Sequence, residues 1–421
     1  MKIIENLKVK EKVYIEKLEN DLTVMIIPKK DVQKKYVIWG TNYGSNDSSF
    51  VVPGEKDITQ VPKGVAHFLE HKMFEQKSGR NSLDTLTSLG VEANAYTTNN
   101  HTAYLFEGID NFYPALDELM DYVQNPYFTD ENVEKEKGII GQEIMMYDDY
   151  PEWRVYINAL EAMYHNNPVK LDITGTIETI SHINKEILYK CYNTFYNPSN
   201  MVMVVCGDFE PTKLIEEIKK RLIKNESNGE IKRIYPEEPK EIVKKEINQK
   251  MEVSIPLYMI GIKVEPLEEE KVNKHIAIEI LLNMLFGESS ILYKELYNKN
   301  LIYERPNLEF EFAKGYAHIL IGGQSNNPEQ LYSIFKKRLN EMKENLNEED
   351  FQRTKKKLYG NYIKEYDDVG SIARMFLSDS FKGINSFDYL EKINTINATY
   401  LKQMLDDVFK EDKMVISTVK N

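Results

Sequence analysis

The stretch that decides the fold is residues 64–75, Gly-Val-Ala-His-Phe-Leu-Glu-His-Lys-Met-Phe-Glu, which has the pattern of a helix. Four residues on a helix advance by about 400°, so His67 and His71 lie about 40° apart on one face. Two imidazoles placed in this way can bind one Zn²⁺. Glu70 projects close to the same face and can reach a water at the metal without being a ligand. Two surface histidines on an ordinary helix are the alternative, but the chain has only seven histidines.

A catalytic zinc usually has three protein ligands and one open position, so a third ligand has to come from elsewhere. The pattern of residues 131–147 predicts an amphipathic helix. Glu136 and Glu143 are seven residues apart on it and share a face. Glu143 has more apolar neighbours, so we expect it to be the more buried, and a buried carboxylate needs a partner such as a metal. A solvated helix face is the better interpretation of Glu131 and Glu134.

The composition excludes several classes of protein. The 421 residues are 42% hydrophobic and carry a net charge of −13, which argues against a disordered chain and against a nucleic-acid partner. Two cysteines exclude a disulfide scaffold and fit a reducing compartment. The N-terminus has neither the apolar region of a signal peptide nor the composition of a transit peptide, and no uncharged apolar run of membrane-spanning length occurs. We therefore expect a soluble cytoplasmic protein with no membrane partner.

An internal repeat predicts two homologous α+β domains. Residues 183–205 and 396–418 align without a gap at a shift of 213, and both segments have the pattern of a helix, a polar turn and a strand. The polar, proline-containing residues 224–246 are the best linker, so we expect domains at 1–235 and 236–421. The first domain should have strands near 22–28, 35–40, 93–97, 103–108 and 201–206, and helices near 64–75, 82–89, 111–123, 131–147 and 187–195.

On these residues the chain resembles the pitrilysin/insulinase family of zinc peptidases over nearly its whole length. It is most similar to the half-length members, which include the mitochondrial processing peptidase and the bacterial YmfH-like branch. The order H-x-x-E-H is the inverzincin signature. The resemblance implies Zn²⁺ as the cofactor, Glu143 as its third ligand, Glu136 as an acidic residue that orients a ligand, and Glu70 as the general base of peptide hydrolysis. It also implies mostly antiparallel sheets flanked by helices, together forming one half of a clam shell.

The resemblance also assigns substrate-binding residues. Asn94-Ala95-Tyr96-Thr97 matches the family's edge strand, which pairs with the backbone of the peptide substrate. Many members carry an Arg and a Tyr in the second domain that bind substrate and stabilise the oxyanion. Here Tyr297 stands at the position of that Arg, and Tyr303 is the nearest match to the Tyr, one residue short in spacing. Arg305 is a possible local substitute.

The second half has no equivalent of the zinc helix ligands. Residues 277–287 match that helix, and Glu279, Leu282 and Asn283 fall opposite His67, Glu70 and His71. We therefore expect an inactive second domain and a zinc endopeptidase that acts on unfolded peptides or peptide precursors in an enclosed chamber. The expected assembly is a dimer in which a zinc-free paralogue supplies the Arg/Tyr pair. The alternatives are a non-catalytic scaffold subunit and a structural zinc site, which would need a fourth ligand.

Overall fold

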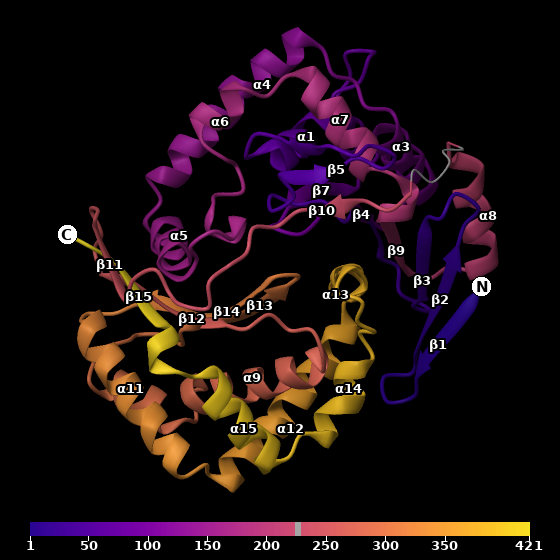
Figure 1. Cartoon of the computed structure of the whole chain (residues 1–421). Helices are drawn as coiled ribbons and strands as arrows, with labels where there is room; N and C mark the ends of the chain where they lie inside the picture. The colour runs from indigo at the N-terminus through magenta and orange to yellow at the C-terminus, as the bar shows by residue number, and fades with distance from the viewer. Residues whose placement is uncertain (224–228) are drawn as a thin grey trace. The chain divides into compact units, whose positions relative to one another are not determined.

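A seven-stranded and a five-stranded sheet organise the fold (Figure 1). The computed structural model describes residues 1–223 and 229–421. Residues 224–228, the first part of the expected linker, lie outside the described residues. The contacts divide the chain into unit 1, which is Met1–Ile144, Asp172–Tyr235 and Ile363–Ser386, and unit 2, which is Met145–Leu171, Pro236–Tyr362 and Phe387–Asn421.

The sheet of unit 1 has the order β1-β2-β3-β9-β4-β8-β7. Only β3 and β9 are parallel, and all other neighbours are antiparallel. The strands are β1 (Lys2–Asn6), β2 (Glu11–Lys17), β3 (Thr23–Pro28), β4 (Lys35–Thr41), β7 (Glu92–Thr97), β8 (Thr102–Gly108) and β9 (Met201–Gly207), and β5 (Ser49–Val51), β6 (Ile58–Gln60) and β10 (Lys232–Arg233) form a small separate sheet. The helices are α1 (Val65–Met73), α2 (Ser82–Ser88), α3 (Phe112–Gln124), α4 (Asp130–Asp148), α6 (Ile177–Ser181), α7 (Lys185–Phe195), α8 (Pro211–Arg221) and α13 (Val369–Phe381). The strands and helices expected for the first half are confirmed to within a few residues.

The sheet of unit 2 has the order β11-β15-β12-β14-β13, which repeats the order β3-β9-β4-β8-β7 of unit 1. The one parallel pair, β11 and β15, stands where β3 and β9 stand in unit 1. The strands are β11 (Glu246–Lys250), β12 (Leu257–Val264), β13 (Asn307–Ala313), β14 (Tyr316–Gln324) and β15 (Met414–Lys420). The helices are α5 (Pro151–Met163), α9 (Lys271–Phe286), α10 (Ile291–Asn298), α11 (Pro328–Glu344), α12 (Glu348–Lys364), α14 (Asp388–Lys392) and α15 (Ala398–Val408). The expected α+β class with mostly antiparallel sheets is confirmed.

The repeat found in the sequence is also present in the structure. The shift of 213 residues relates α7 to α15 and β9 to β15 at both ends of each element. Asn184 and Asn397, an identical pair, both cap their helices, because each side chain accepts a hydrogen bond from the backbone N–H three residues later. The same local sequence signal therefore starts both of these equivalent helices.

Each sheet is covered by a helix that comes from the other half of the sequence. Helix α5 packs on β15 and β12 of unit 2, while α13 packs on β9 and β4 of unit 1. A glycine permits each close approach, since a Cβ at Gly40 would lie 2.9 Å from Leu377, and one at Gly261 would lie 2.9 Å from the sulfur of Met163. The chain passes from unit 1 to unit 2 between residues 235 and 236, and each unit also contains a segment from the other half of the sequence.

One helical stretch of unit 2 is unusually apolar. Residues Lys271–Asn298, which contain α9 and α10, are long and apolar enough to cross a membrane by length and composition alone. Of the most apolar part of this stretch, 61% is buried inside the protein. The core helix of a soluble fold has the same properties, and the expectation that no membrane is involved stays a prediction.

Helix α1 begins at a glycine that no other residue can replace without strain. Gly64 has a φ of 90°, and a Cβ there would lie 2.4 Å from the backbone oxygen of Thr174. Val65, Ala66, Leu69 and Met73 are buried, so this helix start is held against the core of unit 1. The position of the whole histidine-bearing helix thus depends on a residue without a side chain.

We expect Gly64→Ala to destabilise the protein by about 3 kcal/mol, because left-handed strain and a steric collision add at this position. Gly54→Ala is the matched control, since Gly54 has a φ of 84° with nothing within 4 Å of an added Cβ. It should cost only the strain, about 1 kcal/mol. Urea unfolding of both variants measures the difference, and equal losses would contradict the collision with Thr174.

Candidate metal centre

Helices α1 and α4 bring three candidate ligands together. The rings of His67 and His71 are 4.5 Å apart, and Glu143 Oε1 lies 3.7 Å from His67 Nε2 while Oε2 lies 3.5 Å from His71 Nε2. All three ligand atoms lie within 4.8 Å of one another. The two measured separations are too long for good hydrogen bonds, but they match the roughly 3.4 Å between two ligand atoms of one tetrahedral zinc. The residues present therefore fit a Zn²⁺ ion.

Glu136 holds the second nitrogen of one histidine. His71 Nδ1 donates to Glu136 Oε1 at 3.0 Å, which leaves Nε2 as the ligand atom. Burial alone would raise the pKa of Glu136, but the hydrogen bond with His71 and the charge of Lys72 hold it below its usual value. Burial and the charge of His71 lower the pKa of His67 to about 3, so this imidazole is neutral and able to bind a metal. His67 Nδ1 has no hydrogen-bond partner among the described residues.

Lys72 is a part of the site that the sequence did not reveal. Its side chain is only 1% exposed, and its Nζ lies 3.5 Å from Glu136 Oε2 and pairs with Glu75. A buried lysine on a helix looks like any surface lysine in the sequence, and only the packing of α1 against its neighbours distinguishes it. Lys72 keeps Glu136 ionised and so supports the hydrogen bond to His71.

The expectation that Glu143 is more buried than Glu136 is wrong. The side chain of Glu143 is 23% exposed and that of Glu136 only 12%. Two of the apolar neighbours that suggested burial, Ile139 and Met145, are themselves 49% and 42% exposed, so they do not face the core. Glu143 is thus partly exposed, about as much as His71, while Glu136 is the more buried of the two carboxylates.

Glu70 lies beside the ligands on the same helix but is not one of them. Its Oε2 accepts a hydrogen bond of 2.6 Å from the hydroxyl of Thr97 on β7. Burial raises the pKa of the Glu70 carboxyl, and the hydrogen bond from Thr97 and the charge of His71 oppose that rise. Thr97, expected to bind substrate, therefore also positions the expected general base.

The other expected substrate-binding residues lie on two units. Asn94, Ala95, Tyr96 and Thr97 are in β7, the last strand of its sheet, which pairs on one side with β8 and with no other strand of the described residues on the other. In unit 2, Tyr303 is exposed and its hydroxyl accepts a hydrogen bond from Asn326 at 2.6 Å.

Tyr297 and Arg305, the two residues near Tyr303 that bear on the expected Arg, have different contacts. Tyr297 is exposed and stacks on Tyr293. Arg305 donates a hydrogen bond of 3.0 Å to the side chain of Asn283, the residue opposite His71 in the repeat. The guanidinium of Arg305 is thus held by unit 2 itself.

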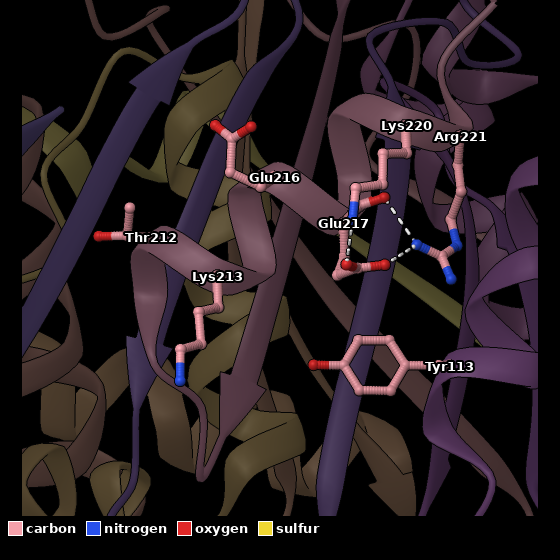
Figure 2. A pocket seen from close by; sticks show the side chains of 7 residues that line it. All are labelled: Tyr113, Thr212, Lys213, Glu216, Glu217, Lys220 and Arg221. Atoms are coloured by element: carbon pink, nitrogen blue, oxygen red, sulfur yellow. Dashed lines mark hydrogen bonds and ion pairs between the residues drawn. The ribbon is translucent and has the colours of Figure 1, made fainter.

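A separate hollow on unit 1 lies between α3 and α8 (Figure 2). Its walls are Tyr113, Thr212, Lys213, Glu216, Glu217, Lys220 and Arg221. Glu217 pairs with both Lys220 and Arg221 (Figure 2). This hollow contains none of the candidate ligands.

Comparison with known proteins agrees with this geometry. Residues 58–177 match the model of the insulinase family, peptidase family M16, and residues 182–358 match the model of the peptidase M16 inactive domain. The chain is 37% identical to the uncharacterized zinc protease YmfH of Bacillus subtilis, across 100% of this chain and 99% of the relative. The chain belongs to peptidase family M16. The resemblance inferred from the sequence is thereby confirmed, and the first matched region contains His67, His71 and Glu143.

Solved structures share the fold of this chain. A crystal structure described as an M16-like peptidase from Alicyclobacillus acidocaldarius has a TM-score of 0.93 and 32% identity, and covers 99% of this chain and 100% of its own. A chain of complex III from Candida albicans has a TM-score of 0.75 at 15% identity, with 97% and 96% of the two chains covered. The second likeness shows the fold alone.

We expect Glu136→Gln to weaken zinc binding about 10–100-fold, because the carboxylate that orients His71 is lost while all three ligands remain. Glu131→Gln is the matched control, an exposed glutamate on the same helix. Competition with a zinc chelator gives both dissociation constants. Equal zinc affinity in the two variants would show that Glu136 has no part in the site.

Proposed function

We propose that this M16 chain is a zinc-dependent endopeptidase that hydrolyses unfolded peptides or peptide precursors. The observation that carries the proposal is that His67, His71 and Glu143 can bind one metal ion together. A fourth side chain, Glu70, precedes His71 directly in the sequence, but its carboxylate is not one of the ligands and contacts Thr97 instead. A structural zinc site has four protein ligands and no use for such a carboxylate. The name of the Bacillus relative, a zinc protease, supports the same cofactor.

The residues of the chain have distinct tasks in this reaction. His67, His71 and Glu143 would hold Zn²⁺, which when bound supplies Lewis acidity to the attacking water and to the scissile carbonyl. Glu70 takes a proton from the attacking water and passes it to the leaving amine. Thr97 keeps the Glu70 carboxylate in place through its 2.6 Å hydrogen bond. Glu136 keeps His71 in the tautomer that binds metal.

The edge strand β7 is suited to hold an extended peptide. An added strand would pair with its free backbone groups, which recognise the main chain of a peptide rather than its sequence. Thr97 ends this strand and contacts Glu70, so a peptide paired with β7 would run past the general base. This arrangement favours unfolded substrates, since a folded protein has no extended backbone to offer.

We expect Glu70→Gln to retain zinc and to lose hydrolysis by about 10²–10⁴-fold, because the general base is removed and the ligands are kept. The assay is cleavage of a quenched peptide together with the zinc content of the same sample. Glu131→Gln should leave both quantities unchanged. A Glu70→Gln protein that cleaved the peptide at the wild-type rate would refute the assigned role.

The active form is proposed to be a dimer with a zinc-free paralogue. Tyr297 occupies the place of the Arg that the resemblance leads one to expect, so the chain lacks one of the two groups that stabilise the oxyanion. A partner chain with Arg and Tyr at these places would supply the pair. Arg305, which donates one hydrogen bond to Asn283, is the alternative source of a positive charge within the chain.

A non-catalytic scaffold subunit is the second candidate function. The likeness to a complex III chain and the match to an inactive domain favour it. The retention of three ligands, of Glu70 and of Glu136 argues against it, because a scaffold needs none of them. The zinc content and peptide cleavage of the wild type separate the two functions.

We expect the isolated chain to cleave peptides slowly and a partner chain to raise the rate roughly 10²–10³-fold, the usual value of one oxyanion donor. The partner should be an M16 chain from the same source that lacks the zinc ligands and carries the Arg/Tyr pair. The same partner with its Arg changed to Ala is the control. An isolated chain that cleaves as fast as the mixture would contradict the division of labour.

A further inference from the structure

Three further metal-ligating side chains meet on the last two strands of the unit 2 sheet. In the pairing of β13 with β14, Glu311 stands opposite His318 and Glu309 stands opposite Leu320. Because side chains alternate along a strand, both carboxylates and the imidazole lie on the same face of the sheet. Their ligand atoms all lie within 4.8 Å of one another. None of these residues belongs to the histidine helix or to its equivalent, α9.

The imidazole of His318 has a free lone pair that points into this cluster. The side chain is fully buried at 0% exposure, and Tyr164 lies beside it. The hydroxyl of Tyr164 donates its single proton to the backbone oxygen of Ala317 at 2.9 Å, so it accepts the hydrogen bond of 3.0 Å from His318 Nδ1. The proton of the imidazole is therefore on Nδ1. Nε2 has no hydrogen-bond partner among the described residues and lies 3.8 Å from Glu311 Oε2.

The charges of the cluster would be balanced by a cation. Glu309 and Glu311 place two carboxylates side by side on this face of the sheet. His318 donates its ring proton from Nδ1 to Tyr164 and has no hydrogen-bond partner at Nε2 among the described residues, so this neutral imidazole does not balance the two carboxylates. No lysine or arginine of the described residues forms an ion pair with Glu309. Tyr316 donates a hydrogen bond to Glu311 Oε1 and so leaves Oε2 facing His318.

We propose that Glu309, Glu311 and His318 form a second divalent-metal site of the chain, suited to Zn²⁺ or Mn²⁺. A neutral imidazole nitrogen with two carboxylates favours these ions over Mg²⁺ and Ca²⁺, which prefer oxygen ligands throughout. A cavity of about 520 Å³ borders Glu309, Tyr156 and Leu320, and it provides room for water to complete the coordination. The buried Nε2, which lacks a partner in the protein, would gain one in the metal.

The proposed site would join three elements of unit 2. Glu309 and Glu311 belong to β13, the edge strand, and His318 belongs to β14. Through its bond to Tyr164, His318 also contacts the residue that ends α5, the helix that unit 2 takes from the first half of the sequence. A bound metal would therefore fix the edge of the sheet and the end of the exchanged helix. This role is independent of hydrolysis in unit 1.

The test uses the full chain with the first site removed by His67→Ala and His71→Ala. The protein is incubated with Zn²⁺ or, separately, Mn²⁺, dialysed, and its metal content is measured by mass spectrometry. We expect roughly one ion per chain to remain for at least one of the two metals, and nearly none after Glu309→Gln is added. Glu304→Gln is the matched control, because Glu304 is an exposed glutamate on the wall of the same cavity but outside the cluster.

A second readout shows whether the variants are folded. The metal should raise the thermal unfolding temperature of the His67→Ala/His71→Ala protein, and Glu309→Gln or His318→Gln should abolish the rise while circular dichroism remains native. The proposal would be overturned if the His67→Ala/His71→Ala protein retained neither metal. It would also be overturned if the Glu309→Gln and Glu304→Gln variants retained equal amounts of metal. Neither result bears on zinc at His67 and His71, so the two sites are tested separately.

Discussion

The approach of α4 to α1 is the interaction on which the candidate active site depends. Two histidines one turn apart on a helix can offer only two ligands, and a third has to reach within roughly 3.4 Å of both. Glu143 does so from α4, and Glu136, two turns earlier on the same helix, contacts the other side of His71. One helix thus supplies a ligand and the group that orients another ligand. A displacement of α4 by one residue would lose both contacts.

The two units share their packing but differ in the polar side chains of one helix. Their sheets have the same order and each receives an exchanged helix at a glycine of the equivalent strand. On α9, however, Glu279 stands where the first histidine would be, and it hydrogen-bonds to Tyr362 within the unit. Packing depends on apolar positions that both units retain, whereas a metal site depends on a few polar side chains that only unit 1 keeps on this helix.

Local spacing made the histidine helix and the repeat predictable from the sequence. The exchange of α5 and α13 was not predictable, because an amphipathic helix has the same pattern whichever sheet it covers. The burial of Lys72 and the exposure of Glu143 depend on how α1 and α4 face each other. The cluster at Glu309, Glu311 and His318 depends on the register of a hairpin, which no spacing along the chain reveals. Each of these features is set by tertiary contacts.

The most direct test of the account is anomalous diffraction at the zinc absorption edge from crystals of the wild-type chain grown with Zn²⁺. The account predicts a peak in unit 1 bound by His67 Nε2, His71 Nε2 and a carboxylate oxygen of Glu143, with the Glu70 carboxylate near the ion but not bound to it. A zinc site completed by a fourth protein ligand, or no peak between α1 and α4, would contradict the assignment of this chain as a zinc endopeptidase.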